Sequence, residues 1–233
     1  GGKKMKRVLG IVAGLMLAAG MVSAQTNVLS QNAVGYVKVT VAYNSLYLVT
    51  VPYLQIDGSG NTLENIFGDQ LPDFSTVHLW NGAGYDSHLY LGGGAFTTPG
   101  VAIPQSAGLW IDTSTAPPGA DVDVFILGEV PGSNNGSDTN TVTGLPGSGI
   151  ELVGFPYPVT ADLATAGLIG TLPDFTTIHQ WTGGSYASAL YLGGGAFTGP
   201  VVVAPGEGFW LDTTTALPGG AWDWTETKPY AYP

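Results

Sequence analysis

The chain contains no cysteine, so neither a disulfide nor a thiolate site is available to it. Basic residues are also scarce, since only six Lys and Arg occur and four of them lie within the first seven positions. Beyond that segment, Lys38 and Lys228 stand against 17 acidic residues, a net charge of −15. A surface of this charge repels nucleic acid and anionic lipid, and without arginine it has no forked donor for phosphate. The composition therefore predicts no nucleic-acid partner.

Catalytic motifs are missing as well. The sequence has no Gly-x-Ser-x-Gly nucleophile elbow, no P-loop and no His-Glu-x-x-His pair. A hydrolase has the least support among the functional classes, because no nucleophile and base occur together in a recognisable motif. The sequence predicts that the protein is not an enzyme and has no cofactor.

Long apolar runs are absent except near the start. Met5-Lys6-Arg7 precedes an apolar run from Val8 to Val22, and Val22-Ser23-Ala24 supplies small residues before Gln25. This pattern predicts a secretory signal peptide over 1–24, with residues 1–4 as extra residues before it. An uncleaved N-terminal anchor is the alternative. The mature chain is then secreted or at the cell surface, with no membrane span.

An internal duplication organises the rest of the chain. The stretch 71–97 returns at 172–198, a displacement of 101 positions. The strongest shorter matches are 89–97 with 190–198, 48–53 with 152–157, and 108–113 with 208–213. A repeat of about a hundred residues is too long for a solenoid unit and long enough for a small domain. We therefore expect an N-terminal arm at 25–35, one repeat at 36–131, a linker at 132–137 and a second repeat at 138–233.

Short strands dominate each repeat. Segment 36–41 alternates polar and apolar residues, and 76–80 and 85–91 flank an Asn-Gly step that favours a hairpin. The glycine triplets at 92–94 and 193–195 predict turns or bulges with positive φ. Further strands are predicted at 45–53, 108–113 and 121–125, and short helices at 61–67 and 160–166. The sequence predicts an all-β fold of two tandem homologous repeats, each a small antiparallel β-sandwich or barrel-like unit with one short helix.

Three turn-and-strand motifs carry a resemblance. They are Asn32-Ala33-Val34-Gly35-Tyr36-Val37-x-Val39, Leu127-Gly128-Glu129-Val130-Pro131 and Pro205-Gly206-Glu207-Gly208-Phe209. Together they resemble a group of secreted tandem-repeat β-proteins from verrucomicrobial and related bacteria. The resemblance covers nearly the whole mature chain, although the Pro-Gly-Glu-Gly turn is degraded at 104–108. It implies export and a tandem β fold, and it implies no activity.

Aromatic residues are the strongest candidates for a binding site. Exposed Trp and Tyr faces beside polar groups stack on sugar rings. The candidate ligand-stacking residues, three from each repeat, are His78, Trp80, Tyr85, His179, Trp181 and Tyr186. The alternative, which we favour, is that these rings fill the core, because they alternate with small polar residues as buried strand faces do.

Carboxylates offer a second kind of candidate. Asp121, Asp123 and Glu129 could bind a surface calcium ion, although the spacing of an EF-hand loop is missing. The repeated aspartates Asp73 and Asp174 are more typical of turns.

Two functions remain open. The first is an extracellular or cell-surface structural or adhesive protein that self-assembles, or binds other extracellular proteins, through strand edges and the N-terminal arm. The second is a carbohydrate-binding module with two similar aromatic sites, in which duplication raises avidity for a polysaccharide.

Overall fold

The computed structural model describes residues 33–56, 58–132, 138–216 and 219–230. The predicted signal peptide, the arm up to residue 32 and linker residues 133–137 lie outside the described residues.

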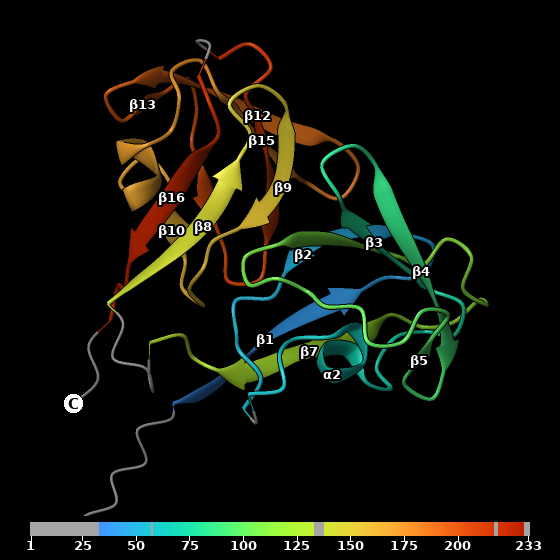
Figure 1. Cartoon of the computed structure of the whole chain (residues 1–233). Coiled ribbons are helices and arrows are strands. Elements are labelled where there is room, and N and C mark those ends of the chain that lie inside the picture. Colours follow the sequence, from blue (N-terminus) through green and yellow to red (C-terminus); the bar gives the residue numbers. More distant parts are fainter. Residues whose placement is uncertain (1–32, 57, 133–137, 217–218, 231–233) are drawn as a thin grey trace, which may run out of the picture. The chain divides into compact units, whose positions relative to one another are not determined.

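Antiparallel strands are the main secondary structure and helices are few and short, so the predicted all-β class is confirmed (Figure 1). Before the linker the elements are β1 (Val34–Val41), β2 (Leu46–Thr50), α2 (Leu63–Phe67), β3 (Thr76–Trp80), β4 (Tyr85–Gly92), β5 (Ala95–Phe96), β6 (Gly108–Asp112) and β7 (Val122–Glu129). After it they are β8 (Thr139–Leu145), β9 (Ile150–Gly154), β10 (Ala161–Asp162), the 3₁₀ helix η2 (Gly167–Gly170), β11 (Thr177–Trp181), β12 (Tyr186–Gly193), β13 (Ala196–Phe197), β14 (Val202–Val203), β15 (Gly208–Asp212) and β16 (Trp222–Thr227). The described helices are all too short to cross a bilayer.

The two halves of the chain carry sheets of the same strand order. In the first half a five-stranded sheet runs β2-β6-β3-β4-β5, and β1 pairs with β7 as a separate two-stranded ribbon. In the second half the corresponding sheet runs β9-β15-β11-β12-β13, and β8 pairs with β16. The first and last strands of each half therefore form a ribbon, and five of the strands between them form the sheet. In the second half the short strands β10 and β14 pair with each other outside that sheet.

The core of each half lies between its ribbon and its sheet. In the first half, Val124 and Ile126 of the ribbon and Phe67 of α2 join Val77 and Leu109 of the sheet in one buried cluster. The second half has its own cluster, in which Trp224 occupies the position that matches Val124. Each half thus has two layers, as the sandwich prediction requires.

The short helix differs between the halves. Thr62 caps α2, because its hydroxyl accepts a hydrogen bond from the Asn65 backbone N–H at 3.2 Å. The predicted helix at 160–166 is wrong. Asp162 accepts a hydrogen bond from the Ala164 backbone N–H and closes a turn there. Among the described residues of the second half, only the four residues of η2 are helical. The β-branched Thr165, whose hydroxyl donates to the Asp162 carbonyl at 3.1 Å, also favours a turn over a helix.

The hairpin and glycine predictions are confirmed. The register of β3 with β4 pairs Trp80 with Tyr85, as an Asn81–Gly84 loop requires. The glycines at 92–94 and 193–195 all have φ between 59° and 93°, and each triplet lies next to a register shift in the edge pair. Strand β1 begins two residues before the predicted start, at Val34.

Candidate functional site

The candidate aromatic residues gather where the two halves meet. Trp80 contacts Trp210 of the other half with ring centroids 5.1 Å apart, and Trp110 contacts Trp181 at 5.2 Å. Both pairs are edge-to-face, at 82° and 83°, a favourable arrangement for aromatic rings. Leu48 and Leu152 complete this interface cluster.

The interface tryptophans also satisfy the edges of the two sheets. The Trp80 indole N–H donates to the Ile150 carbonyl at 3.1 Å, and the Trp181 indole donates to the Leu46 carbonyl at 3.0 Å. These carbonyls belong to β9 and β2, the edge strands of the two sheets. Each half therefore covers the other's open edge.

Backbone hydrogen bonds also join the two halves. The Thr50 N–H donates to the Gly206 carbonyl at 2.9 Å, and the Gly154 N–H donates to the Ser106 carbonyl at 2.8 Å. The contacts are reciprocal at matched positions, as across a two-fold axis. The two halves are thus bonded to each other by both side chains and backbone.

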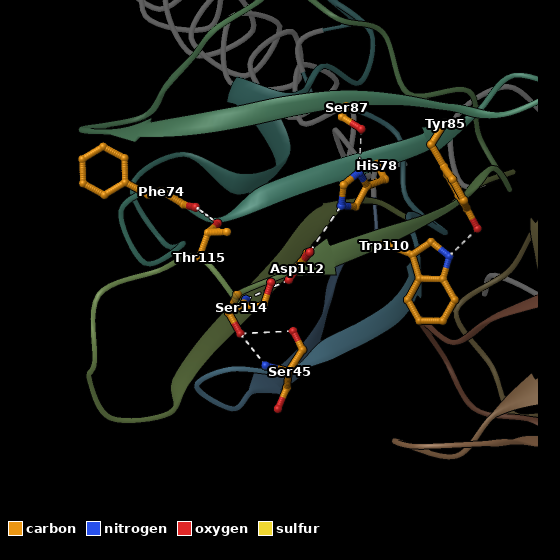
Figure 2. Close-up of polar contacts among 10 residues, drawn as sticks. Ser45, Phe74, His78, Tyr85, Ser87, Trp110, Asp112, Ser114 and Thr115 are labelled. Atoms are coloured by element: carbon orange, nitrogen blue, oxygen red, sulfur yellow. Dashed lines mark hydrogen bonds and ion pairs between the residues drawn. The ribbon is translucent and has the colours of Figure 1, made fainter.

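His78 and His179 each lie in a short polar chain across three strands. His78 Nδ1 is 2.7 Å from Ser87 Oγ, and its Nε2 is 3.6 Å from an Asp112 carboxylate oxygen (Figure 2). His179 repeats both distances with Ser188 and Asp212. The chains link β4 to β3 to β6, and β12 to β11 to β15.

The serines in these chains were missed by sequence reasoning. The hairpin register places Ser87 opposite His78, and it follows directly from the Trp80–Tyr85 pairing across the Asn-Gly turn. A serine, histidine and carboxylate are thus brought together. Their recurrence in both halves, in a line across adjacent strands, is typical of cross-strand side-chain pairing.

Tyr85 and Tyr186 are the most exposed rings of the predicted stacking set, at 45% each. The Tyr85 hydroxyl accepts from the Trp110 indole at 3.1 Å, and partial burial raises the pKa of that hydroxyl. The structure thus brings Trp80, Tyr85 and Trp181 into contact with the other half. The rings of His78 and His179 each contact the tyrosine of their own half, Tyr85 and Tyr186. Their stacking on a sugar stays a prediction.

The carboxylates proposed for calcium are spread along the ribbon. Asp123 and Glu129 are six residues apart on β7, roughly 20 Å along an extended strand. Asp123 pairs with Lys38 at 3.1 Å and accepts from Thr40, and these contacts lower its pKa. Among the described residues there is no cluster of three or more His, Asp or Glu suited to a metal ion.

One part of the outer face of the first ribbon is apolar, beside the polar group of Lys38, Thr40 and Asp123. Val34, Tyr36, Phe125 and Leu127 are 57%, 66%, 38% and 49% exposed. The rings of Tyr36 and Phe125 contact each other across the ribbon, with centroids 5.9 Å apart. We call these four residues the ribbon patch.

The second ribbon lacks this patch. By strand register, the positions that match Tyr36, Phe125 and Leu127 are Thr139, Thr225 and Thr227. The duplication thus supplies an internal comparison, with the same ribbon apolar in one half and threonine-rich in the other.

The ribbon patch borders a strand edge without a partner. Phe125 of β7 exchanges two backbone hydrogen bonds with the Gln70 side chain, so its N–H and C=O point away from β1. Lys38 is opposite Phe125 in the register, so the backbone N–H and C=O of Lys38 point away from β7. Because the direction alternates along a strand, the backbone N–H and C=O groups of Tyr36 and Thr40 point the same way. In the described part of the chain, no backbone group pairs with this outer edge of β1. A groove of about 640 Å³ runs beside Lys38 and Thr40.

Glu151 lines a second groove, of about 490 Å³, between the two halves. Burial raises the pKa of its carboxyl above the ordinary value, and the Leu152 backbone N–H offsets part of this increase. A raised pKa means that folding favours the protonated form. Protonated Glu151 therefore contributes to the free energy of unfolding. This contribution is complete below the ordinary carboxyl pKa and is lost as the pH rises through the raised pKa.

We therefore expect Glu151→Gln to increase the free energy of unfolding at neutral pH and to leave it unchanged at about pH 3, below the ordinary pKa of Glu. Urea unfolding at the two pH values measures this difference. Asp86→Asn, an exposed carboxylate of the same groove, is the control. An equal increase at both pH values would show that ionisation of Glu151 is not the cause.

Comparison of the chain with protein-family models, with curated proteins and with solved structures finds no match. The fold and the side chains described above therefore carry the functional argument by themselves.

Proposed function

We propose that this protein is an exported structural or adhesive protein that self-associates through the outer edge of β1. The observation that carries the proposal is the ribbon patch, an exposed apolar strip that flanks the outer edge of the eight-residue strand β1, where no described backbone group pairs. An unpaired strand edge is a template for another strand, and a neighbouring apolar face adds burial to the backbone hydrogen bonds.

The partner in this proposal is a second copy of the chain. A two-fold contact uses the same patch on both copies, so one self-complementary surface is enough. Tyr36, Phe125 and Leu127 carry no charge, and Lys38 is already paired with Asp123. Two such faces can therefore meet without opposing unpaired charges, in spite of the strongly acidic composition.

Export rests on the signal-like segment at 1–24 and on the acidic, cysteine-free composition of the rest. The N-terminal arm precedes β1 in the sequence, and in this proposal it extends the contact between copies. Localisation outside the cell or at its surface is part of this proposal. The resemblance to secreted tandem-repeat proteins supports it.

The experiment replaces the ribbon patch with the residues of the other half. We expect the chain from Gln25 onward to associate with increasing concentration, and the variant Tyr36→Thr, Phe125→Thr, Leu127→Thr to stay monomeric. Sedimentation velocity and negative-stain microscopy measure this difference. The melting temperature should change by only a few degrees, because these side chains are exposed.

The matched control is Thr139→Ala, Thr225→Ala, Thr227→Ala on the second ribbon, which should associate as the unmodified chain does. A threonine variant that associates at the same concentration as the unmodified chain would rule out the ribbon patch as the interface.

A further inference from the structure

A groove between the two halves contains polar side chains without partners. It measures about 490 Å³ and is lined by His88 and Ser106 from the first half and by Glu151 and Leu145 from the second. This volume lies within the range of small-molecule sites. Trp80, one of the predicted stacking residues, lines the groove as well.

Two of these side chains are buried with their polar atoms unsatisfied. His88 is 8% exposed, and neither of its ring nitrogens has a hydrogen-bond partner. Ser106 is 1% exposed, and its hydroxyl also has none. Buried polar atoms without partners are costly, so a ligand that supplies hydrogen bonds stabilises such a site.

Ser106 also has a strained backbone. Its φ is 66°, in the left-handed region that non-glycine residues rarely adopt. The matched residue in the other half is Gly206, with φ 83°. The first half thus has a hydroxyl at a position where the backbone conformation favours glycine and the second half has glycine.

The corresponding groove on the other side of the interface lacks this set. It measures about 640 Å³ and is lined by Gly206, Ala187 and Tyr47. By position in the repeat, Ala187 corresponds to Asp86, and Gly206 corresponds to Ser106. Likewise, Tyr47 corresponds to Glu151, and Ala189 corresponds to His88. The two halves have therefore diverged at the positions that would contact a ligand.

The hydrogen-bonding groups of the groove select the class of ligand. A neutral imidazole offers one donor and one acceptor, a serine hydroxyl offers both, and the carboxylates of Asp86 and Glu151 accept. A sugar hydroxyl can donate and accept at once, whereas an ammonium ion only donates. None of the described residues that line the groove is Lys or Arg, so an anion has no counter-charge. The Trp80 indole adds an apolar ring surface on which a sugar can pack.

We propose that the groove lined by His88, Ser106, Glu151 and Trp80 binds a neutral carbohydrate through its hydroxyl groups. The site is single and asymmetric, unlike a pair of equivalent aromatic sites. It is independent of association at β1, and the threonine variant of the ribbon patch should bind the same sugar.

The test uses the three histidines of the chain as reporters. The chain from Gln25 onward is titrated with methyl glycosides of glucose, galactose, mannose and N-acetylglucosamine, and with linear hexasaccharides of the same sugars. We expect at least one of them to shift the imidazole NMR signals of His88 and to leave those of His179 unchanged. Binding of the methyl glycoside alone indicates a free sugar, and binding of the hexasaccharide alone indicates a polysaccharide chain.

Variants copied from the other half keep the test specific. His88→Ala and Ser106→Gly reproduce Ala189 and Gly206, so both should fold, and each should weaken binding about tenfold or more. Gln180→Leu, which alters the other groove, is the control and should bind normally. The proposal fails if no sugar shifts His88, if His88→Ala binds as tightly as the unmodified chain, or if putrescine shifts His88 where the sugars do not.

Discussion

Trp80→Ala is expected to lower the free energy of unfolding by about 2–4 kcal/mol, because a partly buried tryptophan is lost together with its hydrogen bond. The ring contacts Trp210 at 5.1 Å and Tyr85 at 5.3 Å, and its N–H satisfies the Ile150 carbonyl. The same change at Trp181 should have a similar effect, since its contacts are reciprocal. Urea unfolding followed by circular dichroism measures the loss.

Trp80→Phe is the matched control, because it keeps a six-membered aromatic ring and removes the five-membered ring with its N–H. We expect Trp80→Phe to lower the free energy of unfolding less than Trp80→Ala does, by about 1 kcal/mol, the value of one hydrogen bond. If Trp80→Ala kept normal stability but was no longer retained on a polysaccharide resin, the ring would be a stacking platform and not part of the interface between the halves.

Lys38→Pro is expected to abolish self-association and to leave the fold intact. The Lys38 N–H points away from β7, so proline removes a donor from the free edge without breaking the ribbon. The variant lacks one N–H donor at the edge, and the proline ring adds bulk there. Both changes should prevent another strand from pairing with this edge. Sedimentation velocity and the melting temperature together separate lost association from lost folding.

Lys38→Ala is the matched control for the lost charge. The alanine variant keeps the N–H at the edge of β1 but leaves Asp123 without its ion-pair partner, so its association should fall less than that of Lys38→Pro. If Lys38→Pro associated as the alanine variant does, the contact between copies would not involve backbone pairing at β1.

Local patterns predicted the strands and turns well, because each depends on neighbours in sequence. The Asn81-Gly82 step and the alternation around it give both β3 and β4, and the glycine triplets have the expected positive φ. The helix expected at 160–166 failed for a local reason, since Asp162 closes a turn in place of capping a helix.

Contacts between the halves could not be predicted from local pattern. The Trp181 indole reaches a carbonyl 135 residues away, and nothing in the neighbourhood of either residue indicates that contact. The sequence did contain a signal for the polar groove. Residues that differ between otherwise matching repeats, such as His88 against Ala189 and Ser106 against Gly206, mark the places where the two grooves differ in chemistry.

Amide hydrogen exchange at low and high protein concentration tests the central claim most directly. The Tyr36 and Lys38 amides point to the outer edge of β1, whereas those of Val37 and Val39 pair with β7. We predict that Tyr36 and Lys38 exchange quickly in dilute solution and become protected as copies associate, while Val37 and Val39 are protected throughout. Rapid exchange at Tyr36 and Lys38 in a solution shown to contain oligomers would contradict association through this edge.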